Sequence, residues 1–390
     1  MVVFSQRARV KMPVLLMGYV GGLKRKSPRL LTLYQTGFIA LTHRHKSIYL
    51  FLFLFFFLFP LTGCGNLFYL SKLGWHQSFI TFQSVPVQDV LSDDALEDAA
   101  KEKIRIIQAV KRYGEERLGL QRTGSYTKYF EIQGPALHVI TASEKHRFHL
   151  HAWNFPIIGR VTYKSFFTKE GALKEKRSLE KKGYDTFLQQ AAAYSTLGWL
   201  KDSIFSTMLR WDEPTLTNII LHEMAHATVY FKGETDLNEQ LATFIGNRGS
   251  IDLLTEKYGP GSKEAALATD YQEDDLLFAG WIDQAHKRLS EFYDRPISKE
   301  EKLRGREDLF RSIQNDFREM KHQFKTDCYK DVERVELNNA VILAYRQYFH
   351  RLDRWENLYD AKGRDLRKVV EFLKEIQASG DKKVLASFLE

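Results

Sequence analysis

The segment His222-Glu223-Met224-Ala225-His226 combines the residue types that metal-dependent hydrolysis requires. Two histidines four residues apart on a helix project from one face, so both imidazoles can bind a single zinc ion. Glu223 lies beside the first histidine and can take a proton from a water whose pKa zinc lowers to about 7. The alternative is an ordinary helix, but these polar residues would be costly on an otherwise apolar helix without a partner. We therefore predict a zinc site with His222 and His226 as ligands and Glu223 as general base.

The third ligand distinguishes the classes of zinc hydrolase. The long metzincin pattern places Gly three and His six residues after the second histidine, where this chain has Val229 and Lys232. The alternative is a glutamate on a following helix, and Glu239 comes after twelve intervening residues. In a competing interpretation Asp236 and Glu239 form a capping box, which satisfies backbone N–H groups only. We favour Glu239 as ligand of one Zn²⁺ per chain and Asp236 as cap. Such sites often carry an acid four residues later, where Thr243 stands.

Two helices must position these residues. The first is predicted over about 215–232, because Pro214 stands near its start and Gly233 just after its end. The second is predicted over 237–249, with Asp236 as its cap. A carboxylate in the first turn of the second helix can then point back at the first helix.

The remaining pattern predicts an α+β fold. Strands of a small antiparallel sheet are predicted from aromatic and β-branched residues over 136–142, 148–155, 160–167 and 184–199. Helices are predicted over 168–183 and from Ser92, as N-cap, to about Leu118. After Pro214 nearly all of the pattern is helical. We expect a sheet-bearing half, 64–213, packed on a helical half, 214–390.

Charge and cysteine content exclude several classes of protein. The 390 residues carry a net charge of +8, but residues 1–64 hold nine Lys and Arg and no acid. Subtracting these nine from the total of 57 leaves 48 basic residues against 49 acidic residues. The basic excess belongs to the leader, so we expect no nucleic-acid partner. Two cysteines exclude a disulfide framework and a cysteine-based zinc site.

Residues 1–63 have the features of a leader with a signal peptide. Arg44 and Lys46 precede an apolar run of about a dozen residues, which is short for a spanning helix. Leu61–Cys64 resembles a bacterial lipobox, in which cleavage leaves the cysteine as a lipidated N-terminus. The alternative is an uncleaved signal anchor. We expect a lipid anchor on Cys64 and a mature domain over 64–390. By resemblance to Gram-negative lipoproteins, Gly65 favours the outer membrane, facing the periplasm.

Several segments together resemble the bacterial family described as putative aminopeptidases. The matching pieces are GSY, AYSTLGW, STML, LHEMAHATVYFKGETDLNEQLATFIG and LNNAVILAYRQY. The similarity covers most of residues 64–376, and the spacing of HEMAH to NEQLAT is its most specific part. The resemblance implies a lipoprotein-type zinc peptidase of the glutamate-ligand class, with a zincin-like active-site helix. In it, His222, His226 and Glu239 match the ligand positions and Glu223 matches the base.

Further candidates lie on a late helix. A phenol or imidazole usually stabilises the oxyanion beside zinc, and Tyr345 and Tyr348 are candidates. The family resemblance favours Tyr348, although a core tyrosine is the more common fate. Asn338 and Asn339 lie in an apolar segment and would need partners if buried, so we consider both for substrate binding and for a structural contact near the site.

The motif predicts hydrolysis and leaves the kind of peptidase open. The GxMEN signature of one zinc aminopeptidase class is absent, so Glu234 or Asp236 would have to hold a substrate amine. The segment 190–198 is either an edge strand that pairs with an extended peptide substrate or a core strand. The alternative function is a non-catalytic, peptide-binding envelope lipoprotein with a structural or vestigial metal site. It predicts a closed coordination sphere with four protein ligands.

Overall fold

The structure is a computed structural model that describes residues 2–4, 64–132, 134–155, 159–191, 193–195 and 201–389. The chain divides into two units, Pro13–Gly74 and Met1–Met12 with Trp75–Glu390. Helix α2 (Cys64–Gln83) begins in the first unit, whereas the leader, β1 (Val2–Phe4) excepted, lies outside the described residues. No helix among the described residues has the length and apolar character that crossing a membrane requires.

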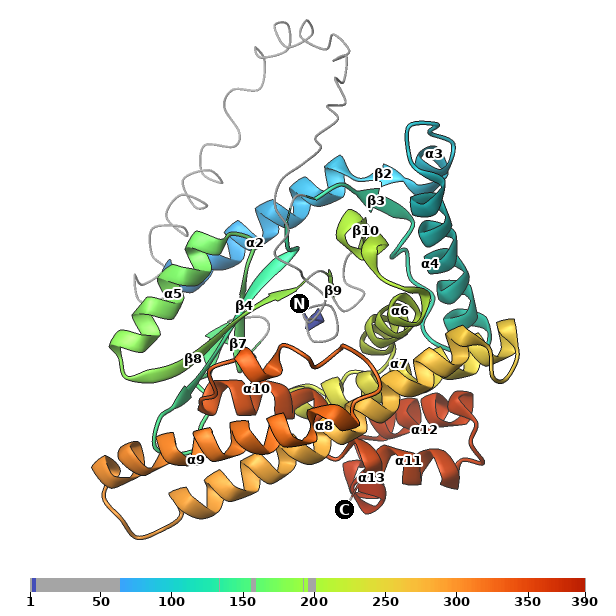
Figure 1. Ribbon diagram of the computed structural model, residues 1–390. Coiled ribbons are helices and arrows are strands. Elements are labelled where there is room, and N and C mark those ends of the chain that lie inside the picture. The colour runs from blue at the N-terminus through green and yellow to red at the C-terminus, as the bar shows by residue number, and fades with distance from the viewer. Residues whose placement is uncertain are drawn as a thin grey trace, which may run out of the picture. The chain divides into compact units, whose positions relative to one another are not determined.

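The largest sheet has β4 (Leu137–Glu144) at its centre, between β7 (Tyr163–Phe166) and β8 (Tyr184–Ala191) (Figure 1). Both neighbours pair antiparallel with β4, which is buried along almost its whole length. Helix α5 (Lys169–Lys181) connects β7 to β8 and packs on both β8 and β4. Thr168 caps α5 by accepting a hydrogen bond from the Gly171 N–H.

Short strands complete the sheet-bearing half. They are β2 (Val85–Pro86), β3 (Lys128–Phe130), β5 (Trp153–Phe155), β6 (Gly159–Val161), β9 (Ala193–Ser195) and β10 (Ile204–Phe205). Strand β10 pairs parallel with β3, whereas β1 pairs antiparallel with β9. The helices here are α3 (Val87–Leu91), α4 (Asp98–Glu116) and the 3₁₀ turn η2 (Ser206–Arg210).

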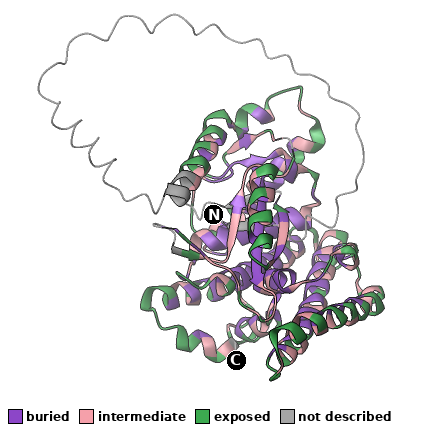
Figure 2. Ribbon diagram, turned by 90° about the vertical axis from the view of Figure 1, so that its left-hand side faces the viewer, coloured by how far each residue is buried: buried purple, intermediate pink, exposed green. Residues whose placement is uncertain are grey.

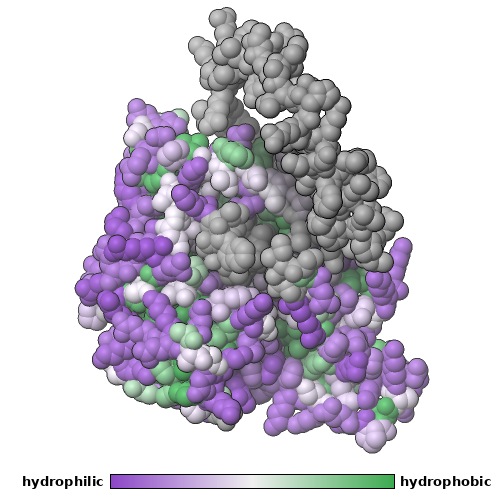
Figure 3. Space-filling model, turned by 180° about the vertical axis from the view of Figure 1, so that it is seen from behind, coloured by the Kyte–Doolittle hydropathy of each residue, from purple (hydrophilic) through white to green (hydrophobic). Residues whose placement is uncertain are grey.

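The helical half begins with α6 and continues to the C-terminus. Its α-helices are α6 (Glu213–Thr228), α7 (Thr235–Tyr258), α8 (Lys263–Tyr293), α9 (Lys299–Met320), α10 (Asn339–Phe349), α11 (Leu352–Ala361), α12 (Leu366–Ser379) and α13 (Lys382–Leu389). Two 3₁₀ turns, η3 (Lys321–Gln323) and η4 (Val332–Arg334), lie between α9 and α10. The face seen in Figure 3 is mostly hydrophilic over its described part.

Helix α6 is buried from Pro214 to His226, and α4, α7 and α8 all pack on it. Figure 2 shows the buried residues, in purple, gathered in the interior of the described part. Asp212 starts α6 by accepting a hydrogen bond from the Thr215 N–H at 2.9 Å. Gly246 of α7 permits the close approach of the two helices, since a Cβ there would lie 2.7 Å from the Asn218 carbonyl oxygen. The contact between α6 and α7 is the most extensive between any two elements of the described chain.

A buried polar chain ties α6 to the helices behind it. The Asn218 side chain donates to Asn247 at 2.6 Å, and Asn247 donates to Asp275 of α8 at 3.0 Å. The Tyr329 hydroxyl donates to the same carboxylate at 2.7 Å. Asn218, Asn247, Asp275 and Tyr329 thus bind one another in the interior, and these bonds fix how α6, α7 and α8 lie together.

The predicted α+β class is confirmed, with antiparallel strands before α6 and helices after it. Ser92 is not the N-cap of α4, because it ends the short helix α3 and Glu97 precedes α4. Only Trp153–Phe155 of the strand predicted over 148–155 forms. The first metal helix ends at Thr228, four residues earlier than predicted, because Val229 adopts an extended conformation.

Asp236 is not a cap, which corrects a second prediction. Helix α7 begins at Thr235, with Glu234 at the N-cap position and no side-chain capping hydrogen bond. Asp236 therefore lies inside the first turn, and the capping box that would have occupied Glu239 does not form. The side chain of Glu239 is left to other contacts.

Candidate metal centre

Three side chains from α6 and α7 meet in the interior. The Nε2 atoms of His222 and His226 lie 3.1 Å apart, and Oε2 of Glu239 lies 3.5 Å from the first and 3.4 Å from the second. All three residues are almost completely buried, at 0–1% exposure. In the described part of the chain, their ligand atoms lie close enough together, within 4.8 Å of one another, to hold one metal ion.

The triangle of ligand atoms fits a tetrahedral metal ion. A tetrahedral zinc site with bonds of about 2.0–2.1 Å places its ligand atoms roughly 3.3 Å apart. The three separations here, 3.1, 3.4 and 3.5 Å, are close to that value. Oε2 of Glu239 is buried and has no hydrogen-bond partner among the described residues, although a buried carboxylate oxygen needs one. A cation between the three side chains would satisfy it.

The short connection between α6 and α7 sets the direction of Glu239. Asn238 holds it, because its side chain accepts from the Phe231 N–H and donates to the Phe231 carbonyl, both at 2.8 Å. Gly233 adopts a φ of 82°, which favours glycine. The chain therefore reverses within a few residues, and the first turn of α7 faces the last turns of α6. Sequence reasoning did not identify Asn238.

Burial and charge act in opposite directions on Glu239. Burial raises the pKa of its carboxyl group, but the imidazoles of His226 and His222 outweigh burial and leave that pKa below its usual range. The carboxylate therefore stays ionised, as a metal ligand must be. Burial also raises the pKa of Tyr230, and the nearby Glu239 carboxylate raises it further.

Within the described chain, two polar atoms next to the candidate ligands lack the hydrogen bonds that usually support a metal site. Nδ1 of His226 and Oγ1 of Thr243 are buried without hydrogen-bond partners among the described residues. Thr243 lies one turn after Glu239 on α7, at the position where related zinc sites often carry an acid. At this position Thr243 thus supplies no carboxylate to orient a ligand histidine.

Glu223 is 2% exposed and lies beside His222 on α6, and Tyr126 lies near it. Burial raises the pKa of the Tyr126 phenol, and the carboxylate of Glu223 raises it further, so the phenol stays protonated. Tyr126 has a φ of 62°, a rare conformation for an aromatic residue. Its N–H donates to the Asp202 carbonyl at 2.6 Å and Gln108 donates to its carbonyl.

Tyr126, like Asn238, is a residue at this site that sequence reasoning missed. The only signal in the sequence is the matching segment GSY, whose last residue it is. Residues held in strained backbone conformations gather at functional sites, where the surrounding structure maintains the strain. Here the hydrogen bonds of the Tyr126 N–H and carbonyl groups maintain the strain.

The remaining candidates lie on α10. Asn338 caps the helix by accepting from the Val341 N–H, and its amide donates to the Thr186 carbonyl. Asn339 is fully buried and binds Tyr293 and Glu144. Both asparagines thus make structural contacts, and their role in substrate binding stays a prediction. Tyr348 is buried, and its catalytic role stays a prediction.

Comparison with known proteins gives one match. Residues 68–386 match the family model described as putative aminopeptidase. No curated protein and no solved structure matches the chain. The matched range includes both metal-ligand helices, Tyr126 and α10.

Proposed function

Since the chain belongs to the family described as putative aminopeptidases, we propose that it is a zinc-dependent peptidase that acts as an aminopeptidase. The observation that carries the proposal is the meeting of His222, His226 and Glu239 around a space of tetrahedral dimensions, with Glu223 on the same helix. The group has three members within the described chain, as in catalytic zinc sites, whereas a structural site is closed by four protein ligands.

His222, His226 and Glu239 would hold the ion. When bound, zinc supplies a Lewis acid that lowers the pKa of water and polarises a carbonyl group. Glu223 accepts the proton of the attacking water and then delivers it to the nitrogen of the leaving amine. Burial of Glu223 keeps bulk water away from the proton during this transfer.

Strand β9 offers a place for an extended peptide. It packs on α6, the helix with both histidines, and Val2–Phe4 of the chain pairs with it antiparallel (Figure 1). In that register Val2 lies opposite Ser195 and Phe4 opposite Ala193. A peptide substrate that takes the position of Val2–Phe4 would gain backbone hydrogen bonds from a strand that packs on α6. This supports the edge-strand interpretation of residues 190–198.

We further infer that the mature protein is anchored by a lipid on Cys64 to the outer membrane, facing the periplasm. The lipobox-like segment Leu61–Cys64 and the basic, apolar leader support this proposal. The membrane partner is then the bilayer that holds the lipid.

Replacement of the general base tests the enzyme proposal. We expect Glu223→Gln to lower kcat by roughly 10²–10⁴-fold on peptides, because the amide accepts no proton. Zinc content, measured by mass spectrometry of the purified protein, should stay at about one ion per chain, since Glu223 is not a ligand.

The matched control is Glu213→Gln at the start of the same helix, where Glu213 binds Lys257 and Tyr258. It should leave hydrolysis unchanged. A purified protein without zinc, or hydrolysis that survives Glu223→Gln, would contradict the proposal.

A further inference from the structure

A cavity of about 640 Å³ opens between the start of α7, helices α8 and α10, strand β6 and the loop after β4. Its volume lies within the range of about 300–1,000 Å³ that ligand sites in proteins span. One wall is apolar, because the rings of Phe148 and His286 stack there with centroids 4.4 Å apart. The other walls carry charged side chains.

The charges on these walls are mostly positive. Arg160, Lys232 and Arg346 all line the cavity, and the first two form no ion pair among the described residues. Of the two acids on the walls, Glu234 is bound to Lys382 outside the cavity at 2.5 Å. Among the described groups without an ion-pair partner outside the cavity, Arg160 and Lys232 thus outnumber Asp236, and Arg346 adds a cation that Asp283 partly balances. This excess favours an anionic ligand.

Arg346 is held in a fixed orientation. One of its terminal nitrogens donates to His350 at 2.8 Å, and His350 in turn binds Asp283 at 2.6 Å. Its Nε is buried, has no hydrogen-bond partner among the described residues and lies 3.7 Å from Asp283. Burial also lowers the pKa of Arg346. The guanidinium is thus held in place on the wall of the cavity, and a planar, fixed guanidinium is suited to bind a carboxylate.

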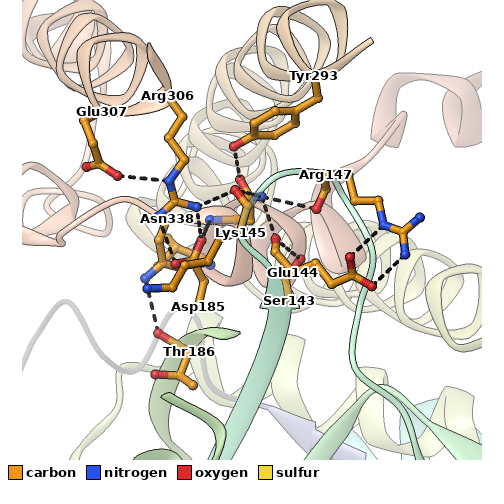
Figure 4. A network of polar contacts seen from close by, with 12 residues as sticks. Ser143, Glu144, Lys145, Arg147, Asp185, Thr186, Tyr293, Arg306, Glu307 and Asn338 are labelled. Carbon is orange, nitrogen blue, oxygen red and sulfur yellow. Dashed lines mark hydrogen bonds and ion pairs between the residues drawn. The ribbon is translucent and has the colours of Figure 1, made fainter. Parts of the chain in front are cut away.

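The loop wall of the cavity is also fixed, as Figure 4 shows. Arg306 points at Asp185, which it binds at 2.6 and 3.0 Å, and donates to the Lys145 carbonyl at 2.7 Å. Asn339 donates to the Glu144 carbonyl at 2.9 Å. These bonds hold the residues just before Phe148–Leu150, which line the cavity. The cavity is therefore preformed on this side.

The cavity adjoins the metal centre through α7. Asp236 lines the cavity, and Glu239 lies three residues later, so the two carboxylates are neighbours on the helix surface. Burial beside the cavity raises the pKa of Asp236, while Arg346 lowers it and Glu239 raises it. Asp236 is thus near enough to interact with both Glu239 and Arg346.

We propose that this cavity is a specificity pocket that binds a carboxylate of the peptide substrate, with Arg346 as its principal contact and Arg160 and Lys232 as supporting charges. The proposal rests on the proposed peptidase function. A carboxylate in a peptide comes either from an acidic side chain or from the C-terminus, and the cavity recognises the chemistry that both share.

Binding to the zinc-loaded Glu223→Gln protein tests the proposal without hydrolysis. The probes are tetra-alanine amide, tetra-alanine with a free carboxylate, and tetra-alanine amides with one Asp at each position in turn. We expect calorimetry to show that at least one carboxylate probe binds about tenfold more tightly than the neutral amide. The probe that binds more tightly shows whether the carboxylate comes from an acidic side chain or from the C-terminus.

Arg346→Gln, made in the same background, should abolish this difference, and Arg346→Lys should restore part of it. The matched control is Arg105→Gln on the exposed face of α4, which should keep the full difference. If Arg346→Gln does not fold, as judged by circular dichroism, the double variant Arg160→Gln with Lys232→Gln replaces it, because both residues are exposed.

Equal binding of neutral and carboxylate probes would overturn the proposal, as would a difference that persists in the cavity variants. Both outcomes are distinguishable from failure of the peptidase proposal. In that case the wild-type protein hydrolyses none of the probes, while the binding difference is still measured.

Discussion

Tyr126 combines three properties at one residue: burial, a left-handed backbone and a position near Glu223. A left-handed conformation costs roughly 1–2 kcal/mol for a residue with a side chain. The hydrogen bonds with Asp202 and Gln108 offset that cost and hold the backbone of Tyr126 in place. The phenol stays protonated, so it can donate a hydrogen bond to charge that develops beside the base.

We therefore expect Tyr126→Phe to lower kcat by roughly 10–100-fold, with zinc content and fold unchanged. Steady-state kinetics on a peptide substrate measures this. Tyr129→Phe is the control, because it also removes a buried phenol, one that binds Glu131 two residues away. An unchanged kcat in Tyr126→Phe would show that the strained backbone serves packing alone.

At this scale the sequence predicts some residues and misses others for identifiable reasons. The spacing of His222 and His226 determines that they share a helix face, so their meeting follows from periodicity. Tyr126 is missed because its left-handed conformation is imposed by contacts distant in sequence. Asp236 is assigned wrongly because the cap position depends on where the connection ends, and Asn238 fixes that end.

At the scale of the elements, Asn339 at the start of α10 should contribute strongly to the stability of the fold. Its side chain is fully buried and accepts from the Tyr293 hydroxyl at 2.8 Å while it donates to the Glu144 carbonyl. Asn339→Ala removes both of these buried hydrogen bonds, so we expect the free energy of unfolding to fall by about 2–4 kcal/mol. Urea denaturation measures the change.

The comparison variant is Asn315→Ala, since Asn315 is exposed and accepts a single bond from Arg318. It should change the free energy of unfolding by less than about 0.5 kcal/mol. A similarly small loss in Asn339→Ala would mean that the loop after β4 does not depend on α10.

Helix α8 carries a histidine whose titration should affect stability. Burial lowers the pKa of His286 to about 4, with further lowering from Arg346 and His350, whereas Asp283 raises it. The unfolded value is about 6.5. As the pH falls from about 6.5 towards 4, the unfolded chain takes up a proton that the folded chain does not, so the contribution of His286 to stability is lost.

Accordingly, His286→Gln should reduce the fall in melting temperature between pH 7 and pH 4.5. His322→Gln, at an exposed histidine, should leave that fall unchanged. Thermal denaturation followed by circular dichroism at a series of pH values compares them. If the melting temperature of His286→Gln falls with pH as steeply as that of the wild type, His286 does not cause the loss of stability.

Element types follow from local pattern, whereas some of their ends do not. Thr168 and Gly183 bracket α5 as predicted, because cap chemistry acts over a few residues. The end of α6 at Thr228 departs from the pattern, since residues 229–232 are drawn out of the helix by the bonds between Asn238 and Phe231. A contact seven residues away thus overrides local propensity.

In the whole molecule, the cavity beside the metal centre could not be predicted at all. Its walls come from segments between Phe148 and Arg346, and nothing in their spacing along the chain brings them together. The α+β layout was predictable because strand and helix patterns separate near Pro214.

The pairing of β1 with β9 predicts that cleavage of the leader affects the binding of peptide substrates. If the leader is cleaved before Cys64, Val2–Phe4 leaves β9 and its edge becomes available to substrate. We expect Cys64→Ala to block both fatty-acid labelling and processing, and the retained leader to raise KM for peptides. A protein that begins after Cys64 should restore KM. Equal KM for both forms would show that β1 does not compete with substrate.

The three side chains that could hold a metal ion come from one short stretch, from His222 to Glu239. The entropy lost on closing a loop grows with its length, so gathering these groups is inexpensive before the rest of the chain has docked. If the protein binds zinc as proposed, we expect the ion to be captured early during folding and to act as a nucleus for the α6–α7 pair. Chelators should consequently slow refolding more than they accelerate unfolding.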